Sequence, residues 1–215
     1  MSRTELSGLY CITDPALTEQ SPLNLVQMVE QAILGGAKII QYRNKRARAG
    51  HQTDIAGQLC QLCRRHSVIF LVNDDPQLAR TVDAHGVHLG QTDSQLREAR
   101  QLLGKNSIIG ITCHGNLDLA RAAERQGADY VAFGRFFPSN TKPEASPAPL
   151  ALLSEARAVL QIPITAIGGV TRSNAKSLLE AGADMLAVIH GVFGQPDILQ
   201  AATGFSRLFD STPGT

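Results

Sequence analysis

Short apolar runs alternate with helix-like segments along almost the whole chain, and this alternation constrains the fold more than any other feature of the sequence. Most of the runs are continuous rather than interrupted by polar residues, as expected of strands that are covered on both faces of a parallel sheet. Between the runs, apolar residues recur at helical spacing, most clearly at Ile198, Ala202 and Phe205. The expected strands are Leu9–Thr13, Ile39–Arg43, Ile69–Asn73, Gly86–Gly90, Ser107–Thr112, Tyr130–Gly134, Pro163–Gly168 and Met185–His190.

A glycine followed by alanine or valine recurs where an expected helix gives way to the next apolar run. These glycines are Gly36, Gly86, Gly127 and Gly182, separated by 50, 41 and 55 residues, or about two strand–helix units each. Glycine suits the left-handed conformation that ends many helices. Eight such units in 215 residues predict an α/β protein, a single-domain (β/α)8 TIM barrel over residues 1–215. The alternative is an open doubly wound sheet, which normally has fewer strands in this length; the chain also lacks a dinucleotide-binding fingerprint.

Composition and charge exclude several classes of protein. A hydrophobic content of 43% suits a globular core rather than a disordered chain. The formal net charge is +1 and no basic stripe is visible, so we expect no nucleic-acid partner. The N-terminus has no apolar signal-peptide core, and no apolar stretch approaches the roughly 20 residues that cross a bilayer. We therefore expect a cytoplasmic protein without a membrane partner.

Cysteine usage offers one possible motif. Cys60 and Cys63 form a C-x-x-C pair, but no second pair or histidine partner lies at zinc-site spacing. Free cysteine is commonly a buried apolar residue, so helix packing is the favoured interpretation. A redox or metal role is the alternative.

Cations cluster at the ends of the expected strands, where parallel barrels form their active sites. Arg43 and Lys45 follow the second strand, and Lys142 lies in the loop after the sixth. Arginine and lysine converging on one mouth are typical of a clamp for an oxygen-rich anion such as diphosphate. Asn73 and Thr112, at the ends of the third and fifth strands, are suitable neutral partners.

Two carboxylates share this mouth. Asp74 and Asp93 would repel a diphosphate unless a cation stood between them, which points to Mg²⁺, an ion that takes one or two carboxylates plus phosphate oxygens and waters. Each aspartate could instead cap the helix that follows it. After the third strand, however, Asp75 with Pro76 fits the capping role better.

Glycines and a proline-rich loop mark the rest of the expected mouth. Gly168 and Gly169 follow the seventh strand, where many barrels bind phosphate through glycine amides, although Gly169 could be only a turn glycine. The Pro138–Pro149 stretch follows the sixth strand, and a loop of this length is often a lid or binding loop. His88 lies inside the expected fourth strand, which favours a packed or hydrogen-bonded core histidine over a catalytic one.

Taken together, these segments resemble the thiamine phosphate synthase family, over roughly residues 8–195 and in the family's order. A piece such as AIGGV is unspecific, because many phosphate-binding barrels have something similar, whereas the combination of QYRNK, NDD, GVHLGQTD and SNTK is specific. The matching pieces are GLYCITD at 8–14, QYRNK at 41–45, NDD at 73–75, GVHLGQTD at 86–93, GITCH at 110–114, GADYVAFGRFFPSNTKP at 127–143, AIGGV at 166–170 and GADMLAVIHG at 182–191.

The resemblance implies a transferase that joins 4-amino-2-methyl-5-(diphosphooxymethyl)pyrimidine to a (carboxy)thiazole phosphate, releasing pyrophosphate by a dissociative, Mg²⁺-assisted substitution. It implies catalytic roles for Arg43, Lys45, Thr112 and Lys142, and metal binding by Asp74 and Asp93. The pyrimidine diphosphate would be held by Gln41, Arg43, Lys45, Asn73, Thr112 and Lys142, with Tyr42 and Asn44 of the same motif in the substrate site. The thiazole phosphate would be held by Ser139, Asn140, Thr141, Gly169, Ile189 and His190.

Three positions depart from the family's usual residues. The family often has serine at the position of Thr112 and threonine at the position of Ser139, so both positions keep a hydroxyl. At position 190 the family often has serine, whereas this chain has the imidazole of His190. A backbone contact at His190 would tolerate this change, whereas a side-chain contact would reshape the site. The rival functions are a thiazole tautomerase and a non-catalytic phosphate-ligand sensor, and the cations and carboxylates of the mouth argue against both. The sequence leaves open the oligomeric state and whether the thiazole carries a carboxylate.

Overall fold

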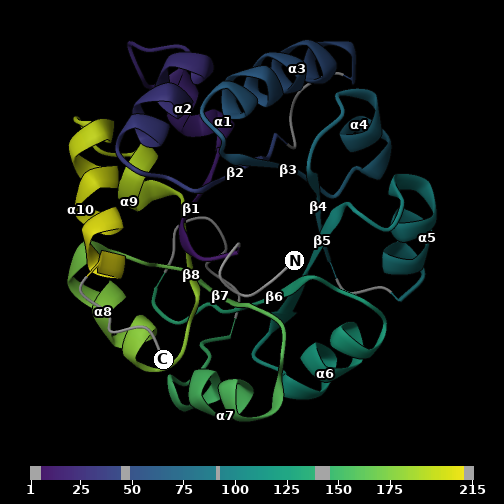
Figure 1. The fold of residues 1–215 in the computed structure, drawn as a ribbon. Helices are drawn as coiled ribbons and strands as arrows, with labels where there is room; N and C mark the ends of the chain where they lie inside the picture. The colour runs from purple at the N-terminus through teal and green to yellow at the C-terminus, as the bar shows by residue number, and fades with distance from the viewer. Residues whose placement is uncertain (1–5, 45–48, 91–92, 139–145, 211–215) are drawn as a thin grey trace.

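Eight parallel strands close into a barrel in which each strand pairs with the next along the chain and β8 pairs with β1, so the expected (β/α)8 barrel is confirmed. Figure 1 shows the strands at the centre and the helices around them. The strands are β1 Gly8–Ile12, β2 Ile39–Tyr42, β3 Ile69–Asn73, β4 Gly86–Leu89, β5 Ile108–His114, β6 Tyr130–Phe133, β7 Ile164–Ile167 and β8 Met185–Val188. The computed structural model describes residues 6–44, 49–90, 93–138 and 146–210.

One helix follows nearly every strand on the outside of the barrel, and two short helices are added after β1 and β8. The short helices escape sequence analysis because one or two turns are too few to show a helical period. Asp14 and Pro15 nevertheless carry a start signal for the first, since Asp14 Oδ1 accepts a hydrogen bond from the Ala16 N–H. The helices are α1 Pro15–Glu19, α2 Leu25–Leu34, α3 Ala49–Arg65, α4 Pro76–Thr81, α5 Asp93–Leu103, α6 Leu117–Arg125, α7 Ala151–Val159, α8 Arg172–Glu180, α9 His190–Phe193 and α10 Ile198–Asp210.

The ends of the strands differ from the expected ones where the backbone leaves the extended conformation. β8 ends at Val188 rather than His190, because Ile189, with φ −110° and ψ −83°, turns the chain into α9. β5 instead continues to His114, past the expected end at Thr112, with a shift of register against β6. His190 is therefore the first residue of a helix and not the last residue of a strand.

Apolar side chains fill two separate layers, one inside the barrel and one between the strands and the helices. In β1, for example, Tyr10 and Ile12 belong to the inner layer, whereas Leu9 and Cys11 belong to the outer one. Cys60 and Cys63 are also buried in the outer layer as free thiols, and burial raises the pKa of Cys63 to about 12. Their environment is that of packed helix residues, in line with the favoured interpretation.

The glycine repeat carries a structural device at the N-terminal end of the barrel. In each of two Gly-Ala-Asp segments, the aspartate accepts a hydrogen bond from a backbone N–H near the start of the preceding strand: Asp129 from Ile109 and Asp184 from Ile164, both at 2.7 Å. An arginine from the helix that precedes that strand binds each aspartate, Arg100 of α5 at 2.7 Å and Arg157 of α7 at 2.6 Å. These contacts link a helix, the strand that follows it and the start of the next strand, and so stabilise the barrel away from its mouth.

No helix among the described residues is both long and apolar enough to cross a membrane.

Gly110 makes room for a large ring in the barrel interior, which leads to a stability prediction. A Cβ on Gly110 would overlap the Tyr130 ring, so Gly110→Ala should destabilise the protein by about 1–3 kcal/mol through overpacking. Gly57, in α3, has no atom outside its own helix within 4 Å of the position of a Cβ. Gly57→Ala is therefore the matched control and should stabilise by up to about 1 kcal/mol. Urea unfolding checks both, and equal midpoints for the two variants would contradict the prediction.

Candidate active site

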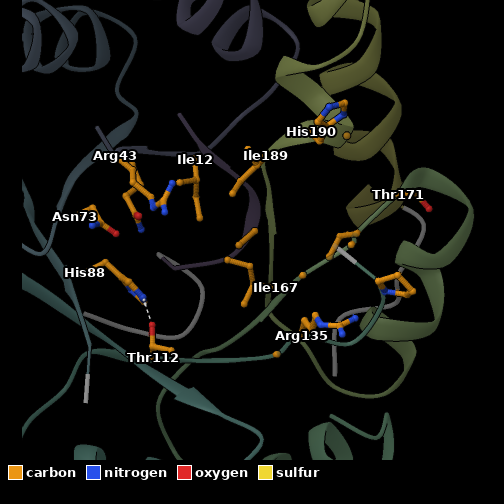
Figure 2. Close-up of a pocket in the computed structure, with 18 of the residues that line it drawn as sticks. Ile12, Arg43, Asn73, His88, Thr112, Arg135, Ile167, Thr171, Ile189 and His190 are labelled. Atoms are coloured by element: carbon orange, nitrogen blue, oxygen red, sulfur yellow. Dashed lines mark hydrogen bonds between the residues drawn. The ribbon is translucent and has the colours of Figure 1, made fainter. Parts of the chain in front are cut away.

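A cavity of about 320 Å³ opens at the C-terminal end of the barrel. Seven of the residues expected to bind substrate line it, from β2, β3, β5 and the segments after β7 and β8. Figure 2 shows Asn73 and His88 on one side of this cavity and Arg135 and Thr171 on the other. The seven are Gln41, Arg43, Asn73, Thr112, Gly169, Ile189 and His190.

Strand alternation decides which residues of the QYRNK segment reach the cavity. Gln41 and Arg43 line it, but Tyr42 points the other way and is buried at 2% exposure in the outer apolar layer. The expectation that Tyr42 lies in the substrate site is therefore wrong for its side chain. Asn44 is not among the residues lining the cavity, and its carbonyl accepts a hydrogen bond from Gln52 Nε2 at 3.2 Å.

Several of the expected site residues lie outside the described part of the chain. Lys45 and the segment Ser139–Asn140–Thr141–Lys142 lie outside the described residues, as does most of the proline-rich loop. Asp93 opens α5, but its side chain also lies outside the described part.

Arg43 is held in the mouth by the end of β1. The Thr13 hydroxyl accepts from the Arg43 N–H at 2.9 Å and donates to the Arg43 carbonyl at 3.2 Å, which ties the two strand ends together. The Asp14 carboxylate lies 3.9 Å from Arg43 Nη1, and both side chains are largely buried. Within the described part of the chain, this long contact holds the guanidinium loosely. The sequence alone indicates no role for Thr13 or Asp14, although both lie in the GLYCITD segment.

Asp74 stands at the rim in an unusual backbone conformation. Its φ is +62°, a left-handed value that is uncommon outside glycine, and its N–H donates to the His88 carbonyl at 2.9 Å. Asn73 Nδ2 donates to Asp74 Oδ2 at 2.7 Å and so orients the carboxylate. The capping role falls to Asp75, whose Oδ1 accepts from the Leu78 N–H, as the sequence indicated. Asp74 therefore has an exposed carboxylate that helix capping does not occupy.

His88 is both a packed core residue and a lining residue of the cavity. Its Nε2 lies 2.8 Å from Thr112 Oγ1, the contact dashed in Figure 2, and its Nδ1 lies 2.8 Å from the Tyr130 hydroxyl. Tyr130 is bonded to Tyr10 at 2.8 Å, and Tyr10 accepts from Gln41 Nε2 at 2.5 Å. Neither tyrosine is recognisable from the sequence as part of the site, because a tyrosine inside an apolar strand is expected to be an ordinary core residue.

The opposite wall is built from glycines and helix starts. Gly169 has φ +65°, and a Cβ there would overlap the carbonyls of Phe137 and Pro138, so glycine is needed at this close approach. The Gly169 carbonyl accepts from Asn174 Nδ2 at 3.0 Å, which joins the turn to α8. The turn and the N-terminal end of α9 both lie at the cavity, where their backbone N–H groups suit an oxyanion.

Arg135 and His190 also belong to this wall, and they differ in how their side chains are placed relative to the cavity. Arg135 lines it and is a cation for which sequence analysis gave no role, although its place directly after β6 was a usable signal. The exposed His190 ring lies over Gly194, where a Cβ would overlap the imidazole. The ring is thus folded back along α9, and the part of His190 best placed to meet a ligand is its backbone.

Comparisons with known proteins agree on one family. The family model described as thiamine monophosphate synthase matches residues 9–192. A thiamine-phosphate synthase of Alcanivorax borkumensis is 53% identical over 209 residues, covering 96% of this chain and 95% of the relative. One of Marinobacter nauticus is 52% identical, covering 94% and 90%. The solved thiamine phosphate pyrophosphorylase from Pyrococcus furiosus superposes with a TM-score of 0.88 at 35% identity, over 99% of both chains.

Burial of the tyrosines makes the fold sensitive to high pH. The chain has three tyrosines, and burial raises the pKa of each above its usual value near 10. The unfolded chain therefore loses these protons first, and the free energy of unfolding should fall as pH rises above about 10, by up to about 1.4 kcal/mol per pH unit and tyrosine. Tyrosinate absorbance should appear together with the loss of circular dichroism. Ionisation of any tyrosine in the intact fold near pH 10 would contradict this.

Proposed function

The chain belongs to the thiamine monophosphate synthase family, and on that premise we propose how its cavity carries out the transfer. Its activity is that of a thiamine-phosphate synthase, a transferase of thiamine biosynthesis. The proposed substrates are 4-amino-2-methyl-5-(diphosphooxymethyl)pyrimidine and a (carboxy)thiazole phosphate, and the products are thiamine phosphate and pyrophosphate. The observation that carries the proposal is the meeting of Arg43, Asn73 and Thr112 in a cavity that Gly169 and Arg135 also line.

The side formed by β2, β3 and β5 would bind the diphosphate. Arg43 offers a charged donor, while Asn73 and Thr112 offer neutral ones, and a charged donor roughly doubles the strength of a hydrogen bond to a phosphate oxygen. Gln41, deeper in the barrel, would meet the pyrimidine end of the same substrate. Lys45 and Lys142, which lie outside the described residues, are proposed as further donors on the strength of the sequence motifs alone.

A magnesium ion is proposed at the rim on this side. Asp74 presents an exposed carboxylate oriented by Asn73, and Mg²⁺ is commonly held by one or two carboxylates with phosphate oxygens and waters. The described residues contain no group of three or more histidines, cysteines or carboxylates suited to a metal, so substrate oxygens and waters would complete the coordination. Asp93 is proposed as the second carboxylate from its sequence position. When bound, Mg²⁺ would neutralise charge on the departing pyrophosphate.

The wall formed after β6, β7 and β8 would bind the thiazole phosphate. Amides at Gly169 and at the start of α9 are suited to a phosphate monoester, and Arg135 would add a charge to this site. His190 would contribute its backbone, consistent with a ring that lies over Gly194. Ser139, Asn140 and Thr141 are proposed for the same phosphate from the sequence alone.

The reaction needs positioning and charge neutralisation rather than a covalent nucleophile. Loss of pyrophosphate leaves a cation at the pyrimidine methylene carbon, and electrons from the ring amino group stabilise it. The thiazole nitrogen then forms the new carbon–nitrogen bond. Ile12, Ile167 and Ile189 give the cavity an apolar wall that suits two flat rings and limits the access of water to the cation. Because both substrates are small soluble phosphates, we propose that the protein acts in the cytoplasm.

The direct test follows pyrophosphate release. Both substrates with Mg²⁺ should yield one pyrophosphate per thiamine phosphate, and EDTA should stop the reaction. Asp74→Asn keeps the size of the side chain but removes its charge, so it should lower turnover at least tenfold, with partial recovery at higher Mg²⁺. Isomerisation of the thiazole phosphate alone, without pyrophosphate, would instead establish a tautomerase. Phosphate-ligand binding without turnover would indicate a sensor.

The two arginines of the cavity should separate the two substrates kinetically. Arg43→Ala should impair use of the pyrimidine diphosphate, and Arg135→Ala use of the thiazole phosphate, each by roughly tenfold to over a hundredfold for a lost charge-assisted contact. Arg125→Ala, an exposed arginine at the end of α6, controls for the loss of one positive charge. If both cavity variants change the same apparent KM, the proposed division of the cavity is wrong.

A further inference from the structure

We propose that a buried chain of hydrogen bonds sets the direction of one hydroxyl in the cavity, and that His88 is the positioning residue that transmits this direction to Thr112. Thr112 would then present its proton, rather than its lone pairs, to the leaving diphosphate. The kinetic part of this inference rests on the proposed function, whereas the structural part concerns the resting protein alone.

The chain crosses the barrel interior through five strands. It begins at Gln41 on β2 and passes through Tyr10 on β1 and Tyr130 on β6 to His88 on β4, which meets Thr112 on β5. The four contacts measure 2.5, 2.8, 2.8 and 2.8 Å in that order. Both tyrosines are almost completely buried, and the barrel around them is apolar, so these groups depend on one another for hydrogen bonding.

The chemistry of the first group sets the direction of the chain. The amide nitrogen of Gln41 can only donate, so the Tyr10 hydroxyl accepts there and its single proton is directed to Tyr130. Burial raises the pKa of both tyrosines, so each hydroxyl keeps the proton with which it donates a hydrogen bond. Tyr130 accepts from Tyr10 and therefore donates to His88 Nδ1.

That donation selects one tautomer of His88. With Nδ1 accepting, the neutral imidazole carries its proton on Nε2, which donates to Thr112 Oγ1 at 2.8 Å. The His88 ring stacks on Tyr130 with the planes at 26°, and Gly110 leaves the space that the Tyr130 ring occupies. The rings are thus fixed in place, and Thr112 keeps its own proton for an acceptor in the cavity.

The direction matters because a diphosphate offers only acceptors. With the opposite tautomer, Thr112 would donate to His88 and turn a lone pair towards the departing oxygens, which would repel them. A donor that is already oriented needs no reorganisation while charge develops on the leaving group. The chain would therefore act on turnover rather than on binding of the thiazole phosphate.

A double-mutant cycle distinguishes positioning from a general structural role. Thr112→Val should lower kcat by roughly tenfold or more, with the KM for thiazole phosphate unchanged. Tyr130→Phe removes the donor to His88 Nδ1 and should lower kcat by a smaller factor. In the double variant, the second change should have almost no further effect, because it acts only through the Thr112 hydroxyl. If the reductions in kcat caused by the two single changes instead multiply in the double variant, the proposal is wrong.

The matched control is Thr165→Val. Thr165 is also a barrel threonine and is fully buried, but its hydroxyl contacts the Met185 sulfur and takes no part in the chain of hydrogen bonds. This variant should keep kcat within about twofold, since it removes a threonine hydroxyl that lies outside the chain of hydrogen bonds. A loss as large as that of Thr112→Val would show that any such change disturbs the barrel, and would count against positioning.

Nitrogen NMR of the unliganded wild-type protein tests the chain without activity. The His88 signal, assigned by its loss in His88→Gln, should show a neutral ring protonated at Nε2, and Tyr130→Phe should introduce the Nδ1-protonated form. Protonation at Nδ1 in the wild type would overturn the proposal, even if thiamine phosphate is formed as expected. Conversely, absence of transferase activity would refute the proposed function and leave this measurement valid. If Tyr130→Phe fails to fold, the wild-type spectrum alone still shows which nitrogen of the His88 ring carries the proton, and so tests the proposal.

Discussion

Hydrogen bonding between β8 and β1 closes the sheet, and the rest of the structure depends on that closure. Because all eight strands are parallel, closure brings their carboxyl ends to one rim and residues distant in sequence into one cavity. It also creates an interior that only the inward-facing side chains can fill. Large residues such as Tyr10 and Tyr130 occupy that space, and the cavity opens above them.

The two ends of the barrel use polar groups differently. At the N-terminal end, the carboxylates of Asp129 and Asp184 accept hydrogen bonds from backbone N–H groups and form ion pairs with arginines of the protein itself. The His85 ring fills the corresponding position before β4, where its Nδ1 accepts from the Phe70 N–H. At the mouth, the carboxylate partner of Arg43 among the described residues is Asp14, at a loose 3.9 Å. Satisfied polar groups thus lie where the barrel needs stability, and less completely paired ones lie where a ligand binds.

The architecture could be predicted from sequence because continuous apolar runs and capping glycines are local signals. The chemistry of the mouth was partly predictable for a related reason, since the rule that active sites lie at strand ends selects Arg43, Asn73 and Thr112 without any knowledge of contacts. Alternation could have excluded Tyr42, because it stands between two inward residues of β2. The core position of His88 was predicted from its place inside a strand, but its hydrogen-bond partners were not, because they come from strands that are separated by up to 42 residues in the chain.

The electrostatics of the cavity depend on the neutrality of the hydrogen-bonded groups inside the barrel, from Gln41 through the two tyrosines to His88. An ionised group at the depth of Tyr10 or Tyr130 would carry a large desolvation cost, and burial keeps both phenols protonated. Among the described residues that line the cavity, the permanent charges are then the guanidinium groups of Arg43 and Arg135, and none is a carboxylate. A pair of cations around an apolar wall favours ligands with oxyanion tails and flat, weakly polar rings. A negative charge on one of the hydrogen-bonded groups beneath the cavity would repel such oxyanions. Neutrality of the barrel interior therefore favours anion binding as well as stability.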